Sequence, residues 1–288
     1  MNRPLTPTRK PAATRTLAPK SAVPPARVNP QRANGVAHAS GQPRLPLALP
    51  EPGLHLDQDA EWFLVKLDGV WRQIRFHDYG AIYNVPGLYE RIFYDILKCK
   101  SPEVLSEALA HALEEAGVNP RELRVLDLGA GNGMVGERLR ALGASRLIGA
   151  DILPEAAAAT RRDRPSVYDA YRVLDFMNLS PAERDALVQE RLNCLTCVAA
   201  LGFGDIPAAA FLAAFDLVER DGWIAFTIKD SFVQDRSGSE FAELIHSLES
   251  DGRLRIVCRQ RYQHRLSTGG VPLYYVCFIG RKQEPAIP

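Results

Sequence analysis

The chain has 288 residues, 46% of them hydrophobic, which is enough for one large globular domain with an appendage. Its formal net charge is +1, no run approaches the roughly 18 apolar residues of a membrane span, and its five cysteines follow no apolar signal segment. These features exclude a membrane-spanning protein and a disulfide-rich scaffold, and they predict a soluble protein in the reducing cytoplasm.

Residues 1–50 are predicted to be a disordered basic tail. They carry six Arg and two Lys but no Asp or Glu, and they hold ten of the 21 prolines and no aromatic residue. Such a segment cannot bury enough surface to offset the entropy of ordering. A transit peptide is the alternative, but prolines break the amphipathic helix that it needs.

The rest of the chain is acidic. The tail's eight basic residues leave 27 of the chain's 35 for the remainder, against 34 acidic side chains. A folded domain with a negative net charge argues against a nucleic-acid-binding surface. The basic tail could still contact RNA or an acidic membrane, although it offers no aromatic side chain for base stacking.

Residues 51–100 are expected to form a hairpin followed by an aromatic, lid-like helical segment. Asp68-Gly69 separates the strand-like runs 62–67 and 70–76, and Asp-Gly is a strong hairpin signal because both turn residues take positive φ. The segment 79–94 then holds four of the nine tyrosines: Tyr79, Tyr83, Tyr89 and Tyr94.

Strands and helices alternate over residues 101–288. A helix is predicted to begin at Ser101, whose side chain can cap it, with Pro102 in its first turn, and to end at Gly117. The predicted strands are 124–128, 146–151, 171–174, 194–198, 223–228, 253–264 and 272–281, and the helices between them are 134–142, 154–162, 181–191, 207–218 and 239–248. No helix separates the last two strands. The pattern predicts an α/β fold with a doubly wound, mostly parallel seven-stranded sheet and a C-terminal antiparallel hairpin.

A glycine-rich turn joins the first predicted strand to the next helix. Gly129, Gly131 and Gly133 provide permissive backbone where a ligand can approach, and Asp151, 20 residues after Gly131, ends the next strand, where an acid meets ribose hydroxyls. The same turn also fits the weak nicotinamide fingerprint. Asp127, just ahead of the turn, would repel a pyrophosphate and favour a cationic amino-acid ligand, which points to S-adenosylmethionine.

The stretch 125–133, Val-Leu-Asp-Leu-Gly-Ala-Gly-Asn-Gly, resembles the first motif of class I, Rossmann-like methyltransferases that use S-adenosylmethionine. The similarity extends over about residues 100–281. The resemblance implies that the methionine part of the cofactor lies against Asp127, Gly129, Ala130, Gly131, Asn132 and Gly133, the ribose at Asp151, and the adenine at Ile152, Asp175 and Phe176 or Met177.

The predicted strand at 194–198 lacks two signatures of base-methylating enzymes. It has neither the Asp/Asn-Pro-Pro-aromatic motif nor a Pro-Cys nucleophile. Cys194 and Cys197 have a metal-like spacing, but residues three apart on a strand point to opposite faces, so they are expected to be core thiols and no metal site is predicted.

A dedicated catalytic residue need not exist, because a sulfonium methyl group is already electrophilic and the protein mainly aligns the reactants and excludes water. If the acceptor carries a proton, a base would help. The candidates are His77, Tyr79, Tyr83, Asp205 and Lys229, with Asp78, Asp230 and His264 less central. Each also has an ordinary explanation, as solvated surface or as aromatic packing.

A small-molecule acceptor is expected, because the folded part is acidic and the aromatic segment resembles the lids of small-molecule methyltransferases. Three alternatives remain: a methyltransferase acting on RNA or protein, an NAD(P)-dependent oxidoreductase, and a non-catalytic cofactor-binding protein. Binding of NAD(H) rather than S-adenosylhomocysteine would indicate the oxidoreductase.

Overall fold

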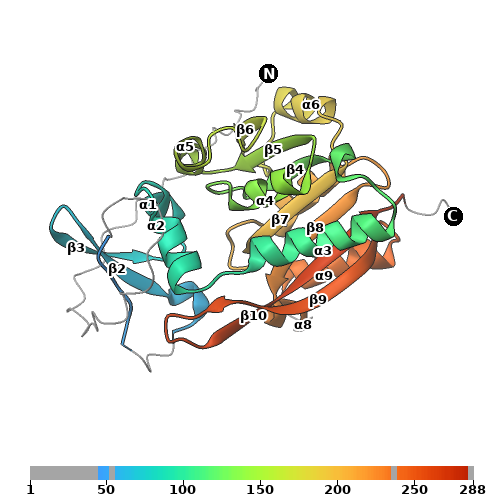
Figure 1. Ribbon diagram of the computed structural model, residues 1–288. Helices are drawn as coiled ribbons and strands as arrows, with labels where there is room; N and C mark the ends of the chain where they lie inside the picture. Colours follow the sequence, from blue (N-terminus) through green and yellow to red (C-terminus); the bar gives the residue numbers. More distant parts are fainter. Residues whose placement is uncertain (1–44, 52–55, 235–238, 285–288) are drawn as a thin grey trace, which may run out of the picture.

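The computed structural model describes residues 45–51, 56–234 and 239–284 (Figure 1). Its larger part is a seven-stranded sheet. In spatial order the strands are β6 (Ala170–Val173), β5 (Arg146–Asp151), β4 (Arg124–Leu128), β7 (Cys194–Leu201), β8 (Trp223–Lys229), β10 (Pro272–Lys282) and β9 (Leu254–Leu266). The first five are parallel, β10 runs antiparallel to β8, and β9 runs antiparallel to β10. The predicted fold is confirmed.

Helices cover both faces of this sheet. On one face lie α3 (Ser101–Glu115) and α4 (Met134–Leu142), and on the other lie α6 (Pro181–Gln189), α7 (Ala208–Asp216) and α9 (Glu240–Ser250). Neighbouring residues of β4 point to opposite faces, so Val125 packs in the core beside α3 and Leu126 in the core beside α7. Cys194 and Cys197 are likewise buried in opposite cores, as predicted. No helix in the described ranges combines the length and apolar character that crossing a bilayer requires.

The remaining helices are short or lie at the sheet's edge. Among them are α5 (Pro154–Asp163), α8 (Asp230–Gln234), η2 (Gln58–Ala60) and η4 (Pro120–Glu122). Of these, α5 follows β5 and contacts the aromatic segment described next.

A second, three-stranded antiparallel sheet precedes the main domain. It contains β1 (Leu47–Ala48), β2 (Trp62–Leu67) and β3 (Val70–Arg75), followed by α1 (Tyr79–Tyr83), α2 (Leu88–Glu90) and η3 (Arg91–Ile96). The Asp68-Gly69 turn has φ values of 51° and 81°, so the predicted hairpin is confirmed. Residues 56–97 are called the N-terminal unit below.

A buried ion pair docks the N-terminal unit onto the β9–β10 hairpin. The Arg265 guanidinium donates to Oε2 of Glu61 at 2.5 Å, and the backbone N–H of Thr268 donates to Oε1 at 2.6 Å. The two charged side chains are only 3% and 1% exposed. Nearby, the Gln58 amide donates to the Tyr275 hydroxyl at 2.8 Å.

The structure corrects the predicted end of the tail at residue 50. Leu47 and Ala48 form β1, pair with Val65 and Leu64, and are only 2% and 3% exposed. Leucines at 45, 47 and 49 alternate along this stretch, the spacing at which a strand presents side chains to one face. Residues 1–44 of the predicted tail lie outside the described residues.

The capping role predicted for Ser101 is also wrong. Lys100 occupies the capping position, and the Ser101 side chain makes no cap hydrogen bond. Its hydroxyl lies 2.6 Å from the Tyr262 hydroxyl and 2.6 Å from Nδ1 of His264, both on β9. The buried hydroxyl therefore ties the start of α3 to the sheet, while Pro102 lies in the first turn as predicted.

Removing residues 1–50 is expected to lower the melting temperature relative to removing residues 1–44. The longer deletion takes away β1 and the buried Leu47 side chain, whose burial contributes about 1.5–3 kcal/mol. A loss of that size lowers the melting temperature by roughly 5 °C in a domain of this length. Thermal unfolding of the two truncated proteins side by side provides the measurement, and equal midpoints would show that β1 adds nothing.

Candidate functional site

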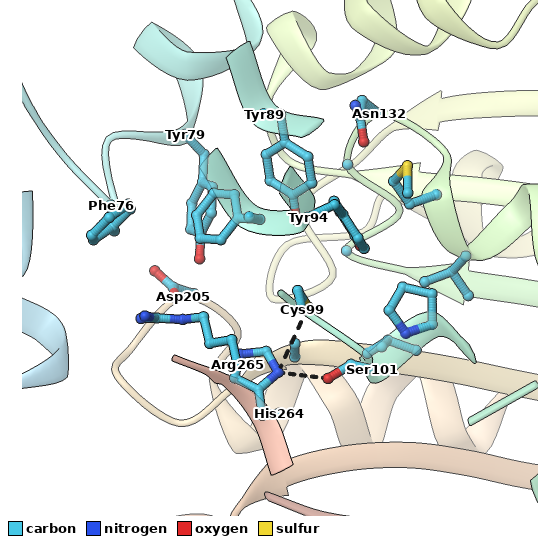
Figure 2. A pocket seen from close by; sticks show the side chains of 18 of the residues that line it. Phe76, Tyr79, Tyr89, Tyr94, Cys99, Ser101, Asn132, Asp205, His264 and Arg265 are labelled. Carbon is cyan, nitrogen blue, oxygen red and sulfur yellow. Dashed lines mark hydrogen bonds between the residues drawn. The ribbon is translucent and has the colours of Figure 1, made fainter. Parts of the chain in front are cut away.

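Two adjoining cavities lie at the carboxyl ends of the parallel strands. The outer cavity has a volume of about 580 Å³ and is bordered by the loops after β4, β5, β6 and β7. The inner cavity, of about 60 Å³, lies between the N-terminal unit, the start of α3 and the β9–β10 hairpin (Figure 2). The residues that border both are His77, Tyr79, Tyr83, Tyr89, Gly129, Val198, Ala199 and Asp205.

The glycine turn between β4 and α4 is held from several sides. The Gly131 N–H donates to Asp151 at 3.0 Å, and its carbonyl accepts hydrogen bonds from Thr160 at 2.8 Å and Tyr171 at 2.7 Å. Gly131 has a φ of 55°, and a Cβ there would collide with the Tyr83 hydroxyl. Glycine is therefore required both for the backbone conformation and for the close approach of Tyr83.

Asp127 lies behind this turn and lines neither cavity. One of its oxygens accepts a hydrogen bond from Tyr168 at 2.6 Å and the other from Thr196 at 2.7 Å. Loss of hydration by burial raises the pKa of Asp127 from its ordinary 3.8 to about 6, although the two hydroxyl donors oppose that rise and the charge of Asp151 adds to it. The carboxylate thus fastens β4 to its neighbours.

The residues predicted to meet the adenosine part come together along the outer cavity. Asp151, Ile152, Asp175 and Phe176 all line it. Asp151 is mostly buried, and burial raises its pKa despite hydrogen bonds from the backbone of Leu153 and Gly131. Ile152 is 58% exposed, whereas Phe176 is buried and 6% exposed, so the two apolar side chains differ in how freely a ligand can reach them.

Asp175 also has a local structural role. Its carboxylate accepts hydrogen bonds from the Asn178 amide at 2.7 Å and the Met177 N–H at 2.8 Å, and these bonds hold its pKa below the ordinary value. The carboxylate remains ionised and shapes the turn after β6.

The rest of the predicted cofactor loop divides between the two cavities. Gly129 borders both, while Ala130, Gly131 and Asn132 line the inner cavity, and Gly133 lines neither. The loop thus runs from the outer cavity to the inner one.

Four of the five catalytic candidates meet where the cavities join. His77, Tyr79, Tyr83 and Asp205 border both, and Nδ1 of His77 lies 2.9 Å from Oδ2 of Asp205. Lys229 lines neither cavity; its ammonium lies 5.1 Å from the centre of the Phe203 ring. Asp78 pairs instead with Arg75 at an exposed position, and Asp230 pairs with Arg261.

The aromatic segment covers the loop as a docked lid. The Tyr83 and Tyr89 ring centres are 5.2 Å apart, and those of Tyr89 and Phe93 are 4.7 Å apart. Glu90 accepts hydrogen bonds from Asn132 and from the Arg164 guanidinium, each at 2.7 Å. The lid therefore packs through aromatic rings and is anchored by one carboxylate to the glycine loop itself.

The carboxyl end of β7 is irregular where it borders both cavities. Its pairing with β8 shifts between Cys197 and Leu201, and Ala199 has a φ of 54°. A left-handed conformation costs a non-glycine residue roughly 1–2 kcal/mol. The Ala199 N–H donates to the Thr227 hydroxyl at 2.8 Å, which helps to hold the irregular backbone. The bulge directs the following loop, with Phe203 and Asp205, across the cavities.

Sequence reasoning missed most of the inner cavity wall. Gln58, Ser101, Arg265 and Tyr275 line it, and of these the sequence marked only Ser101, as a helix cap. His264 also lines it, and burial lowers its pKa well below 6.5, so the ring stays neutral. Figure 2 shows His264 hydrogen-bonded to Ser101 and Cys99 on one side of the cavity, with Tyr79 and Asp205 on another.

Asp127→Asn is expected to remove a pH dependence of stability. Since the folded-state pKa of Asp127 is raised, its stabilising contribution is present below about pH 4 and is lost as the pH rises through about 6. From pH 5 to pH 8 the free energy of unfolding should fall by about 1 kcal/mol more in the wild type than in the variant.

Urea unfolding at both pH values measures this difference. Asp185→Asn, an exposed substitution on α6, is the control and should behave as the wild type. The same pH dependence in Asp127→Asn and the wild type would contradict the assignment.

Comparisons with known proteins agree with this geometry. Residues 102–265, more than half of the chain, match a family model described as a methyltransferase domain. No curated protein matches the sequence. The N-methyltransferase NodS from Bradyrhizobium japonicum, solved with S-adenosyl-L-homocysteine, is similar over 73% of this chain and 98% of its own, with 15% identity and a TM-score of 0.50.

Magnesium protoporphyrin IX methyltransferase from Synechocystis, solved with bound S-adenosylmethionine, is similar over 72% of this chain and 91% of its own, with 14% identity and a TM-score of 0.47. The family match covers the glycine turn, β5 and the hydrogen-bonded carboxylates described above. The chain belongs to the methyltransferase-domain family and is a class I S-adenosylmethionine-dependent methyltransferase.

Proposed function

We propose that this enzyme methylates a small molecule in the cytoplasm, with the adenosine part of S-adenosylmethionine in the outer cavity. The observation that carries the proposal is the outer cavity, which brings Asp151, Asp175 and Phe176 together beside an aromatic lid. Its volume of about 580 Å³ lies within the range of roughly 300–1,000 Å³ that is typical of small-ligand sites.

The side chains of the outer cavity suit a nucleoside. A mostly buried carboxylate at Asp151 can accept hydrogen bonds from two ribose hydroxyls, and its backbone donors hold it in a fixed orientation. Ile152 and Phe176 offer apolar surface for a flat base, and the Asp175 carboxylate can accept from an exocyclic amine. When bound, the cofactor supplies a methyl group on a positively charged sulfur.

We assign the methionine part to the loop Gly129–Asn132, because this loop leads from the outer cavity into the inner one. Asp127 and Gly133 then act without touching the ligand. Asp127 fastens β4 through Tyr168 and Thr196, and Gly133 has a φ of 89°, which lets the turn enter α4.

The lid supports a small acceptor. Tyr83 packs directly over Gly131, and its carbonyl accepts a hydrogen bond from Arg162 at 3.1 Å, so the lid closes over the loop. A covering of this kind excludes water from a compact substrate but obstructs a polymer. The acidic excess of residues 51–288 opposes tight binding to a phosphate backbone as well.

Asp151→Ala is expected to weaken S-adenosylhomocysteine binding by about 1.5–3 kcal/mol, the loss expected for charged hydrogen bonds. Isothermal calorimetry measures the dissociation constant, with Asp185→Ala as the control that should leave it unchanged. Wild-type affinity in Asp151→Ala would remove Asp151 from the site, and binding of NADH in place of S-adenosylhomocysteine would favour the oxidoreductase alternative.

The acceptor class is tested with S-adenosylmethionine carrying a labelled methyl group. We expect label in the small-metabolite fraction of a host extract, and less of it with Tyr83→Ala, because an open lid admits water and misaligns the reactants. RNA and protein fractions from the same extract are the comparison. Label confined to these macromolecules would contradict a small acceptor and would favour a role for the basic tail.

A further inference from the structure

We propose that His77, oriented by Asp205, is the general base of the reaction, so that the acceptor is a molecule whose reacting O–H or N–H group must lose a proton. The inference rests on the proposed function and names the acceptor chemistry of the same site. It depends on the hydrogen bond between the two residues, on their place between the cavities, and on the chemistry of the other candidates.

The hydrogen bond fixes which nitrogen of His77 is available. Nδ1 lies 2.9 Å and 3.1 Å from the two oxygens of Asp205. A carboxylate only accepts hydrogen bonds, so Nδ1 must carry the proton and donate it. In the neutral ring, Nε2 is then left with a lone pair. Within the described ranges, Nε2 makes no hydrogen bond.

Aromatic neighbours hold the His77 ring in place. Its centre is 5.8 Å from that of Tyr79, which it meets edge-on, and 5.3 Å from that of Phe203. The side chains of His77 and Asp205 are 17% and 26% exposed. The imidazole is thus shielded on its flanks yet reachable by a molecule in the cavities.

The position of the pair distinguishes it from an ordinary surface ion pair. Both residues border the outer and the inner cavity, and so does Gly129 of the cofactor loop. An acceptor placed between the cavities can therefore contact the imidazole while it faces the cofactor. Figure 2 shows Asp205 beside Tyr79 and Arg265 in the wall of the inner cavity.

The other four candidates are less suited to accept the proton. Burial raises the pKa of Tyr79 and of Tyr83 well above 10, so both hydroxyls keep their protons. Lys229 lines neither cavity. The oxygens of Asp205 are engaged by His77. Of the five, His77 is the imidazole, and it borders both cavities while its Nδ1 is engaged by Asp205.

The proton transfer accompanies methyl transfer. The acceptor's O–H or N–H bond breaks, the proton goes to Nε2 of His77, and the bonding electrons stay on the heteroatom. An electron pair of that heteroatom forms the new bond to the methyl carbon, while the electrons of the broken carbon–sulfur bond remain on sulfur as a neutral thioether. The imidazolium beside Asp205 then releases its proton to water.

The other charged groups near His77 interact with other residues, so Asp205 is its direct charged partner. Asp78 is paired with Arg75 on the exposed side, and Arg265, facing the inner cavity, is neutralised by Glu61. The Lys229 ammonium lies beyond the Phe203 ring. The rate should fall at low pH, because a protonated imidazole has no lone pair.

The first test reads the imidazole directly and needs no acceptor. Nitrogen NMR of the full-length protein with S-adenosylhomocysteine should show His77 protonated on Nδ1 and not on Nε2. Replacing that ligand by S-adenosylmethionine, which adds one positive charge, should shift the His77 signals, while the exposed His111 stays unchanged. Protonation on Nε2, or equal His77 signals with both ligands, would overturn the proposal.

This outcome is separable from failure of the proposed function. If calorimetry shows that neither ligand binds, the proposed function fails and the base assignment with it. If both bind and His77 does not respond, only the base assignment fails.

The second test measures methyl transfer from labelled S-adenosylmethionine to the small-metabolite fraction. His77→Gln should lower the rate by ~10²–10⁴-fold, as for other general bases, remove the acid limb of the pH profile, and leave S-adenosylhomocysteine affinity unchanged. Asp205→Asn should lower the rate and disturb the Nδ1 proton, and Asp205→Glu should restore part of both. His111→Gln is the matched control. A wild-type rate and pH profile in His77→Gln would overturn the proposal.

Discussion

The buried ion pair between Glu61 and Arg265 determines where the N-terminal unit stands on the main domain. Two charges removed from water are stable only when each meets its partner and further donors, so the pair tolerates one arrangement. Here Glu61 also accepts the N–H of Thr268, and Arg265 also donates to the carbonyl of Leu266. Other docking positions would leave a buried charge without these partners.

Everything that the N-terminal unit contributes to the site depends on this position. The lid reaches the glycine loop through Glu90 and Tyr83, and His77 of the same unit reaches Asp205 in the loop after β7. Gln58 joins the unit to Tyr275 in the wall of the inner cavity. A cavity of about 60 Å³ has room for a few water molecules, so small displacements of this wall change its contents.

The sequence predicted the strands, helices and turns that depend on neighbouring residues. Strand and helix periods recur over short windows, and the Asp68-Gly69 and Gly129–Gly133 turns need positive φ that glycine permits, so their positions could be read from neighbouring residues. Predictions failed where the partner is distant. The Ser101 hydroxyl suits a helix cap by local rules, but its partners lie more than 160 residues away on β9.

The hydrogen bonds of Asp127 likewise depend on residues that are distant in the sequence. Its charge and place in the motif suggested a ligand contact, whereas its oxygens are held by Thr196, the residue opposite it on β7, and by Tyr168. The order of strands in the sheet decides that pairing, and no short segment encodes it. His77 and Asp205 were separate candidates for the same reason, since only the folded chain brings them together.

The distance in sequence between His77 and Asp205 affects how the protein protects the methyl donor from water. His77 and Asp205 are 128 positions apart, one in the N-terminal unit and one in the loop after the β7 bulge. If the unit moved away from the sheet, the oriented imidazole and the cover over the glycine loop would be lost in the same event. With its site open to solvent, the protein would then have no positioned base that could activate water to attack the sulfonium of the cofactor. Docking of the N-terminal unit therefore couples the two functions, so that the lid and the oriented base are present together or absent together.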